Sequence, residues 1–279
     1  MTIRGNTRLI AHIGYPTHTF KAPMVFNPYF EHAGIDAVVV PMGCQAAPYP
    51  AFLKAVFSLT NIVGALITMP HKVATVALLD DTSAAVKIAG SCNAVRRAAD
   101  GRLQGDLFDG EGFVRGIRRK GFKVQGARAL IVGAGGVGAA IAAALAAAGA
   151  SELTLFDVRA QAAARLAERL RHHYPQLGVS TGTNDPAGRD LVINATPLGM
   201  NDGDPLPLDA GRLAPQTFVG EVVMKEEMTP LLKQAAARGC RYQVGTDMLF
   251  EQVPAYLEFF GLPSTSPETL RALARISYA

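Results

Sequence analysis

Cysteine is scarce in this sequence: its 279 residues include three, Cys44, Cys92 and Cys240, far apart along the chain. An odd number of cysteines without close pairing argues against a disulfide framework and against a zinc site. There is also no H-x-x-x-H pattern and no cluster of acidic residues that would indicate another kind of metal site. The thiols are therefore expected to be buried and reduced, and no bound metal is expected.

Long hydrophobic runs are also missing. The most apolar stretch, AAIAAALAAAGA (139–150), is interrupted by glycine and is too short to span a bilayer. The N-terminal segment MTIRGNTRLIAHIG has neither the apolar core nor the small-residue cleavage site of a signal peptide. We therefore expect a cytoplasmic protein without a membrane partner.

Charge is sparse and nearly balanced. Charged residues make up 18% of the chain and hydrophobic ones 49%, which is typical of a globular protein with sizeable cores and excludes disorder. The net charge is +4, without a block of lysine and arginine. This balance favours anionic small molecules as ligands over nucleic acid.

The first 110 or so residues alternate short apolar runs with segments of helical spacing. Buried strands are predicted at 8–14, 36–40 and 61–68, and helices at 23–33 and 49–59. Repeated strand–helix alternation implies parallel pairing through crossover helices. The first half is therefore expected to be an α/β domain.

The second half begins near Gln125 with a strand, a glycine loop, a helix and a strand. Gly133, Gly135 and Gly138 fit G-x-G-x-x-G, and the next strand ends at Asp157, 24 residues after the first glycine (157 − 133 = 24). The first glycine permits a tight turn, the second lets the backbone approach a pyrophosphate, and the third lets the helix pack on the strand. Helix N-terminal amides then face the phosphates. This context favours a dinucleotide site over a glycine turn without a ligand.

Further elements follow the glycine loop. Strands are predicted at 190–196, 217–223 and 241–244, and a helix over 248–261 is expected to return to the first domain.

Asp157 also bears on the choice of cofactor. A carboxylate at this place can accept hydrogen bonds from both ribose hydroxyls of NAD, and it would repel the 2′-phosphate of NADP. Arg159, two residues later, could soften that repulsion. The sequence therefore predicts NAD, with NADP the less favoured cofactor.

The segment GALITMPHK (64–72) contains a candidate proton donor. Pro70 suits the first turn of a helix, predicted here over 70–80, so Lys72 would lie just past the carboxyl end of a strand, where ligands bind in open α/β sheets. Hydride transfer to or from an alcohol carbon needs a proton partner, and Asp109, at a strand–helix junction, could orient Lys72. From spacing alone, a structural salt bridge would be the commoner arrangement for such a pair.

Six motifs occur in the order found in shikimate and quinate dehydrogenases: GALITMPHK, AGSCNAV, LQGDLFDGEGF, VGAGGVGAAIAAAL, NATPLGM and GTDMLFEQ. The chain resembles this family over nearly its whole length. The resemblance implies an N-terminal α/β substrate domain, completed by C-terminal helices, and a Rossmann dinucleotide-binding domain. The implied boundaries are 1–110 for the substrate domain, 111–245 for the NAD-binding domain and 246–279 for the returning helices.

The resemblance also implies a set of site residues. Lys72 and Asp109 match the catalytic pair, and Thr68, Asn93 and Gln252 match substrate-binding residues. The implied cofactor site is formed by Gly133, Ala134, Gly135, Gly136, Val137, Gly138, Asp157, Arg159, Ala195, Thr196, Pro197, Val222, Gly245 and Met248. Asp157 stands in place of the asparagine of the family's NADP-type NRT segment.

The substrate pocket departs from the family pattern. Phe20 and Ala22 stand where relatives have two serines that hold the substrate carboxylate. Leu66 replaces an asparagine, Met224 replaces a tyrosine, and Leu107-Phe108 replaces an asparagine-threonine pair. Thr17, Thr19 or Lys21 could substitute for the serines if the loop differs. We therefore expect a shikimate dehydrogenase-like member with a divergent pocket.

Three functions follow as alternatives. The first is an NAD-dependent dehydrogenase of a hydroxylated alicyclic acid of the shikimate or quinate type, as in aromatic amino acid biosynthesis. The second is a dehydrogenase of a related cyclic alcohol, such as an amino-substituted or less polar analogue, and the third is a non-catalytic ligand sensor. A homodimer is a candidate assembly. His12, inside an apolar strand pattern, is expected to be a satisfied core residue.

Overall fold

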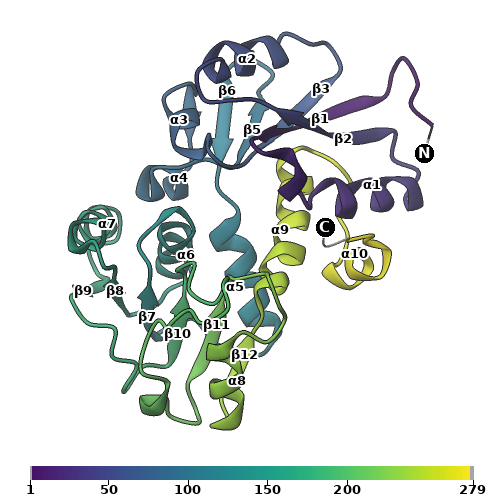
Figure 1. Cartoon of the computed structure of the whole chain (residues 1–279). Coiled ribbons are helices and arrows are strands. Elements are labelled where there is room, and N and C mark those ends of the chain that lie inside the picture. Colours follow the sequence, from purple (N-terminus) through teal and green to yellow (C-terminus); the bar gives the residue numbers. More distant parts are fainter. Residues whose placement is uncertain (1, 277–279) are drawn as a thin grey trace. The chain divides into compact units, whose positions relative to one another are not determined.

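The computed structural model describes residues 2–276, and the chain divides into two units (Figure 1). The first unit comprises Met1–Phe108 and Val253–Ala279, and the second comprises Asp109–Gln252. The boundary between Gln252 and Val253 falls inside helix α9 (Gly245–Phe259), so this one helix contributes to both units. The boundaries predicted from the sequence, after residues 110 and 245, stay a prediction.

The first unit is built on a six-stranded sheet in the order β2-β1-β3-β5-β6-β4. Its strands are β1 (Arg8–Gly14), β2 (Ala37–Gly43), β3 (Ile62–Ile67), β4 (Asp81–Thr82), β5 (Ala94–Arg97) and β6 (Leu103–Asp106). β1 lies between β2 and β3 and pairs in parallel with both, as the strand–helix alternation predicts. Helices α1 (Pro23–His32) and α2 (Tyr49–Val56) lie on opposite faces of these strands (Figure 1).

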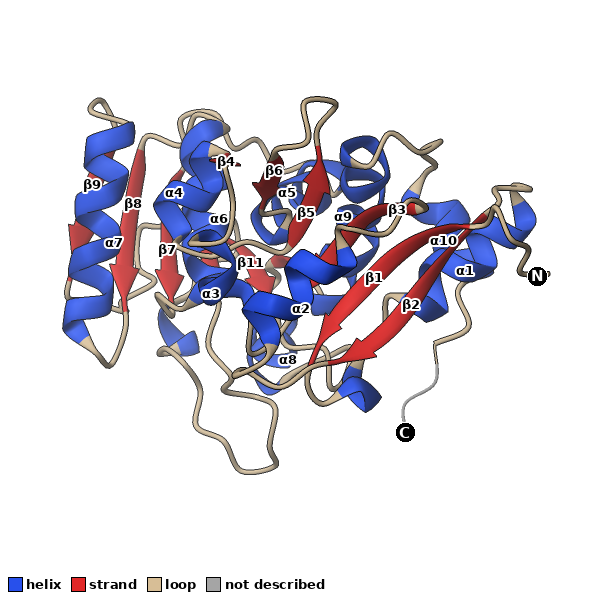
Figure 2. Cartoon of the chain, turned by 90° about the horizontal axis from the view of Figure 1, so that it is seen from above, coloured by secondary structure: helices blue, strands red, loops and turns tan. Residues whose placement is uncertain are grey.

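Strands β5 and β6 were not predicted from the sequence, and they depart from the parallel pairing that the strand–helix alternation implies. β5 pairs antiparallel with both β3 and β6, and β5 and β6 lie side by side in Figure 2. Only a few residues join them, including Gly101 at φ +88°, and so short a connection permits a hairpin but no crossover. The Asp100-Gly101 pair is a turn signal that the sequence contains.

The helix predicted over 70–80 is shorter than expected. Helix α3 covers Lys72–Val76, and Pro70 precedes it. After Val76 the amides of Leu78 and Leu79 donate to carbonyls three residues back, those of Thr75 and Val76, so the chain continues as tighter turns and not as an α-helix. Lys72 still lies in the first helical turn. The remaining helices of this unit are α4 (Ala84–Ala89), the end of α9, and α10 (Pro267–Leu273).

The second unit has a six-stranded, fully parallel sheet in the order β12-β11-β10-β7-β8-β9. The strands are β7 (Arg128–Val132), β8 (Glu152–Phe156), β9 (Gly178–Thr181), β10 (Leu191–Asn194), β11 (Phe218–Glu221) and β12 (Arg241–Gln243). Numbered from β7, this is the order 6-5-4-1-2-3, which is the doubly wound order of dinucleotide-binding domains. The order reverses between β7 and β10, and in such folds ligands bind outside the carboxyl ends of the strands at that point.

Helices α5 (Asp109–Arg119), α6 (Gly136–Ala147), α7 (Ala160–His173) and α8 (Pro230–Ala237) complete this unit together with the start of α9. The alanine-rich α6 packs closely on α5: a Cβ atom at Gly110 would overlap the carbonyl of Ala140. Small residues are therefore needed on both helices at this contact. None of the helices in the described part of the chain combines the length and the apolar character of a membrane-spanning segment.

Candidate functional site

The glycine loop lies directly after β7, at the point where the strand order of the second unit reverses. Gly133 has φ +105°, and a Cβ atom there would lie 2.6 Å from the carbonyl oxygen of Ala195. A Cβ atom at Gly138 would overlap the carbonyl oxygen of Gly133. A Cβ atom at Gly135, in contrast, would meet nothing within 4 Å. The first and third glycines are thus fixed by packing, and the second borders open space where a phosphate could lie.

The N-terminus of helix α6 presents amides beside this space. Gly135 caps the helix without a side-chain hydrogen bond, and the amide of Ala139 donates to its carbonyl. The amides of Gly136, Val137 and Gly138 therefore precede the first helical hydrogen bond. Such amides, together with the helix dipole, bind anionic groups. The loop fits the pyrophosphate of a dinucleotide.

Asp157, just after β8, fastens the glycine loop from the other side. Its carboxylate accepts from the amide of Ala134 at 2.8 Å and from the amide of Arg159 at 2.9 Å. Burial acts to raise the pKa of Asp157, but these two hydrogen bonds and the charge of Arg159 outweigh it, so the pKa is below its ordinary value. Asp157 is therefore an anion at neutral pH, placed next to the candidate phosphate site.

The loop after β10 borders the glycine loop on the side opposite Asp157. The side chain of Asn194 is fully buried; its amide nitrogen donates to the carbonyl of Leu198 at 3.0 Å, and its oxygen accepts from the hydroxyl of Thr196 at 2.7 Å. The amide of Ala195 donates to the carbonyl of Val132 at 2.7 Å. Ala195, Thr196 and Pro197 are thus held in a loop whose backbone contacts Gly133.

Glu221, at the end of β11, organises this region and was missed in the sequence. It is fully buried, and its carboxylate accepts from the amides of Val222 and Val223, from Asn194 and from the hydroxyl of Thr229. Burial raises the pKa of Glu221 despite these hydrogen bonds. A glutamate inside the apolar run TFVGEVV is the signal that could have identified it. It fixes the position of Val222, a predicted cofactor residue.

Two further predicted cofactor residues belong to α9. Gly245 begins the helix, and a Cβ atom there would overlap the carbonyl of Val223. Met248, one turn later, is 3% exposed. The structure thus places the predicted cofactor residues at the ends of β7, β8, β10 and β11 and in the first turn of α9, all within the second unit.

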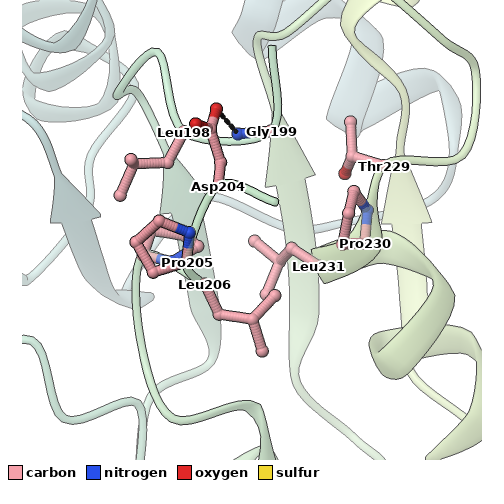
Figure 3. Close-up of a pocket in the computed structure, with 9 residues that line it drawn as sticks. Leu198, Gly199, Asp204, Pro205, Leu206, Thr229, Pro230 and Leu231 are labelled. Carbon is pink, nitrogen blue, oxygen red and sulfur yellow. Dashed lines mark hydrogen bonds between the residues drawn. The ribbon is translucent and has the colours of Figure 1, made fainter. Parts of the chain in front are cut away.

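A small cavity lies near this region (Figure 3). It is lined by Leu198, Gly199, Asp204, Pro205, Leu206, Pro207, Thr229, Pro230 and Leu231. The amide of Gly199 donates to the carboxylate of Asp204 at 3.0 Å on its edge. Its volume of about 10 Å³ leaves room for about one water molecule, so it is no ligand site.

The predicted substrate residues of the first unit gather near the ends of β1, β3 and β5. The amide of Thr68 donates to the carbonyl of Ile13, and a Cβ atom at Gly14 would contact both the methyl group of Thr68 and the ring of Phe20. Phe20 is 7% exposed, whereas Ala22, at the N-terminus of α1, is half-buried. Phe20 and Thr68 are therefore neighbours in one unit.

Asn93 is almost fully buried and only partly satisfied. Its side-chain oxygen accepts from the amide of Phe108 at 3.0 Å, and its Nδ2 has no partner within the described residues. A buried donor without a partner costs free energy unless a ligand pairs with it. This observation fits the substrate-binding role that the sequence predicts for Asn93.

The predicted catalytic residues both begin helices. Lys72 is the first residue of α3 in the first unit, and Asp109 is the first residue of α5 in the second. Asp109 is 6% exposed. Gln252, also in the second unit, is 7% exposed and packs on Gly112, where a Cβ atom would overlap it. Their joint action stays a prediction.

The three cysteines are free and buried, as expected. Among residues 2–276, no group of three or more histidine, cysteine, aspartate or glutamate side chains could hold a metal ion.

Comparisons with known proteins agree with this arrangement. Residues 12–95 match the family described as shikimate dehydrogenase substrate binding domain. A shikimate dehydrogenase (NADP(+)) of Acidiphilium cryptum is 35% identical over 277 residues, which cover 98% of each chain. One of Rubrobacter xylanophilus is also 35% identical and covers 90% of this chain and 89% of its own.

Solved structures extend the comparison. Shikimate 5-dehydrogenase from Listeria monocytogenes, in complex with shikimate and NAD, superposes with a TM-score of 0.91 at 26% identity and 98% coverage of both chains. The ligand-free 5-ketofructose reductase of Gluconobacter sp. strain CHM43 gives 0.87 at 28% identity, covering 96% of this chain and 99% of its own. The chain therefore belongs to the shikimate dehydrogenase family, and it is a nicotinamide-dependent oxidoreductase of the type that acts on CH–OH donors.

Proposed function

We propose that this protein transfers a hydride between NAD and a ring hydroxyl or ketone of a hydroxylated alicyclic substrate, with Lys72 and Asp109 as the proton-transfer pair. The observation that carries the cofactor half of this proposal is the glycine cradle beside Asp157, with its open side at Gly135. A cytoplasmic location and a homodimer remain predictions from the sequence.

The proposed chemistry divides between cofactor and protein. A bound nicotinamide would supply the hydride chemistry, as acceptor from the carbinol carbon or as donor to the ketone. In the oxidative direction Lys72 takes the hydroxyl proton, and in the reductive direction it returns the proton to the forming alkoxide. Asp109 orients the ammonium and balances its charge. Asn93 and Thr68 hold ring hydroxyls, with the unpaired Nδ2 of Asn93 as a ready donor.

The preference for NAD rests on the residues that follow β8. Asp157 is ionised, its side chain is 9% exposed, and it would repel a 2′-phosphate. Val158, which stands at the arginine position of the NRT segment, is 92% exposed and offers such a phosphate no charge. Arg159 lies 3.5 Å from Asp157 and is the nearby cation that opposes this preference. The curated relatives named above carry NADP(+) in their names, so this chain would differ from them.

Phe20 bears directly on the choice of substrate. Its buried ring and the methyl group of Ala22 replace two hydroxyls that would hold a carboxylate. A hydrogen bond to a charged group contributes roughly 1.5–3 kcal/mol, so the loss of two weakens carboxylate binding by orders of magnitude. Thr17 and Lys21 remain as other donors on the same loop. A neutral or amino-substituted cyclic alcohol is therefore the second candidate substrate, and a non-catalytic sensor is disfavoured by the retained Lys72 and Asp109.

The Gluconobacter neighbour supports the second candidate. It is named as a 5-ketofructose reductase, and a ketofructose is a sugar without a carboxylate. Its identity to this chain, 28%, is similar to the 26% of the Listeria shikimate dehydrogenase. A protein of this fold thus acts on a substrate that needs no carboxylate-binding hydroxyls.

A matched pair of substrates tests these alternatives. Shikimate and its methyl ester differ in the negative charge, and both can be assayed with NAD and with NADP by the absorbance of the reduced cofactor. We expect the ester to have the higher kcat/KM and NAD the higher affinity. A higher kcat/KM for shikimate would assign the protein to the acid. No turnover of either compound or of quinate with the oxidised cofactors, and none of 5-ketofructose with the reduced cofactors, would leave the sensor.

A further inference from the structure

His12 is a buried polar side chain without a use in the proposed function. It lies in the middle of β1, it is 7% exposed, and its Nδ1 has no hydrogen-bond partner within the described residues. This contradicts the expectation that it is a satisfied core residue. An unpaired buried nitrogen costs roughly 1–3 kcal/mol, so a valine or leucine would be the more stable choice at a purely structural position.

The register of the sheet places His12 on the face that carries the predicted substrate residues. Ile10 pairs with Gly64 and His12 with Leu66, so these side chains share one face of β1 and β3. Gly14 is next on this face, and its missing Cβ leaves room for Thr68 and for the ring of Phe20. His12 thus lies two residues before Gly14, and both Phe20 and Thr68 lie beside that glycine.

The ring of His12 is stacked on that of Phe20, with centroids 4.0 Å apart and planes inclined by 28°. This stacking holds the imidazole against Phe20, one of the two residues that stand in place of the family's serines. Burial, and then the nearby charge of Lys72, lower the pKa of His12 to about 4. The imidazole is therefore neutral at physiological pH and brings no positive charge to a carboxylate.

We propose that His12 is a substrate-binding residue whose neutral imidazole pairs with an uncharged hydroxyl or carbonyl oxygen, in the part of the pocket that Phe20 has made unsuitable for a carboxylate. The inference rests on the proposed function, because it assumes that the pocket beside Lys72 takes a cyclic alcohol. Specificity for a neutral oxygen would then depend on His12 of β1, and not on the loop before α1 that contains Phe20.

Asn93 provides a parallel. It is also almost fully buried, it also keeps one side-chain nitrogen unpaired, and it is a predicted substrate residue of the same unit. A pocket that binds several ring oxygens requires unpaired polar atoms such as Nδ1 of His12 and Nδ2 of Asn93. The hydroxyl oxygen of Ser91, two residues before Asn93, is a third buried polar atom of this unit without a partner among the described residues.

The test compares His12→Phe with Ile10→Val. Phenylalanine keeps the ring and its stacking on Phe20 but removes both nitrogens, while Ile10 lies on the same face of the same strand and is fully buried and apolar. We expect His12→Phe to raise KM for methyl shikimate or 5-ketofructose by about tenfold, with little change in kcat or NAD affinity and an equal or higher melting temperature. Ile10→Val should lower the melting temperature and leave KM unchanged, and His12→Asn should recover part of the lost affinity.

An unchanged KM in His12→Phe, on the best neutral substrate, would overturn the inference. If wild-type protein turned over neither methyl shikimate nor 5-ketofructose, the proposed function would have failed. The role of His12 would then be decided by a measurement of ligand binding. The ring resonances of His12, assigned by comparison with His12→Phe, should then move when methyl shikimate or 5-ketofructose is added. Resonances that stay in place with both compounds would leave His12 without a ligand.

Discussion

The imidazole of His12 and the phenyl ring of Phe20 are stacked at 4.0 Å in the first unit of this protein. The two residues come from β1 and from the loop before α1, and neither carries a charge at neutral pH. The pair combines an apolar phenyl ring with one unpaired imidazole nitrogen, which suits a hydroxylated carbon ring better than a carboxylate.

Replacing the aromatic loop residue should restore binding of an acid. The double variant Phe20→Ser with Ala22→Ser supplies two hydroxyls and removes apolar bulk. Because each hydrogen bond to a charged group contributes roughly 1.5–3 kcal/mol, we expect kcat/KM for shikimate to rise by about tenfold or more. Activity on methyl shikimate should fall in the same variant.

The measurement is steady-state kinetics on both compounds, with Ala22→Ser alone as the control because it adds one hydroxyl and keeps Phe20. If the wild-type protein already used shikimate as efficiently as its best other substrate, the argument about the pocket would fail. A bound carboxylate on Thr17 or Lys21 in a crystal structure would then explain the result.

Removal of the proposed proton donor should affect catalysis and spare the cofactor. Lys72→Ala is expected to lower kcat by about 10²–10⁴-fold, the usual range for a lost general acid or base. The dissociation constant for NAD, measured by fluorescence titration, should barely change, because Lys72 belongs to the unit without the glycine loop. Asp109→Asn should give a smaller loss of kcat. Turnover near the wild-type value in Lys72→Ala would remove this residue from the mechanism.

Asp157 should decide between NAD and NADP. Asp157→Asn removes the charge that repels a 2′-phosphate, so the ratio of the two dissociation constants should move towards one. Asparagine also loses an acceptor for the amides of Ala134 and Arg159, so affinity for NAD should fall moderately. Arg159→Ala is the matched control and should strengthen the preference for NAD. Tighter binding of NADP by the wild-type protein would show that Arg159 dominates.

The glycine loop offers a contrast between two alanine substitutions. A methyl group at Gly135 meets nothing within 4 Å, so Gly135→Ala should keep the melting temperature of the wild type. It should nevertheless weaken NAD binding, because the methyl group enters the space proposed for the pyrophosphate. Gly138→Ala forces a Cβ atom onto the carbonyl of Gly133 and should destabilise the fold by about 1–3 kcal/mol.

Both variants are compared by urea unfolding and by NAD titration. Unchanged NAD affinity in Gly135→Ala would place the pyrophosphate elsewhere.

Local signals explain what the sequence could predict. The strand at 8–14 has the predicted bounds, and the glycine loop, the strand before it and Asp157 follow as expected because spacing and glycine content are properties of short segments. The hairpin of β5 and β6 was missed because the strands are short and the expected alternation favoured a crossover. The family resemblance, and with it the two-domain α/β fold, is confirmed by relatives that match nearly the whole chain.

Non-local relations explain what the sequence could not predict. The role of Glu221 depends on four groups from β10, β11 and the start of α8 that fold around it. The unpaired state of His12 depends on which side chains β3 and the loop before α1 bring to it. The glutamate inside TFVGEVV marks Glu221 as unusual, but an isolated polar residue in an apolar run looks the same whether it is satisfied or not, so the partners of Glu221 and His12 cannot be predicted from the run.

The pH dependence of stability should report the burial of His12. Its pKa of about 4 in the folded protein lies below the ordinary value of 6.5, so between these values the unfolded chain takes up a proton that the folded chain does not. The stability that depends on the neutral ring is therefore complete above about pH 6.5 and is lost as the pH falls towards 4. At about 1.4 kcal/mol per pH unit, the loss approaches roughly 3 kcal/mol.

His12→Phe cannot take up this proton, so its stability should fall less between about pH 7 and about pH 5 than that of the wild type, by roughly 2 kcal/mol. Free energies of unfolding from urea titrations at both pH values give this difference directly, and carboxylates that also titrate there cancel in the comparison. Ile10→Val should follow the wild-type slope, because it leaves the imidazole in place. Lys72→Met should reduce the difference, since the ammonium of Lys72 is the charge that adds to burial in lowering the pKa of His12. Equal slopes for the wild type and His12→Phe would mean that the ring is protonated as readily in the folded protein as in the unfolded chain, and that its surroundings admit water.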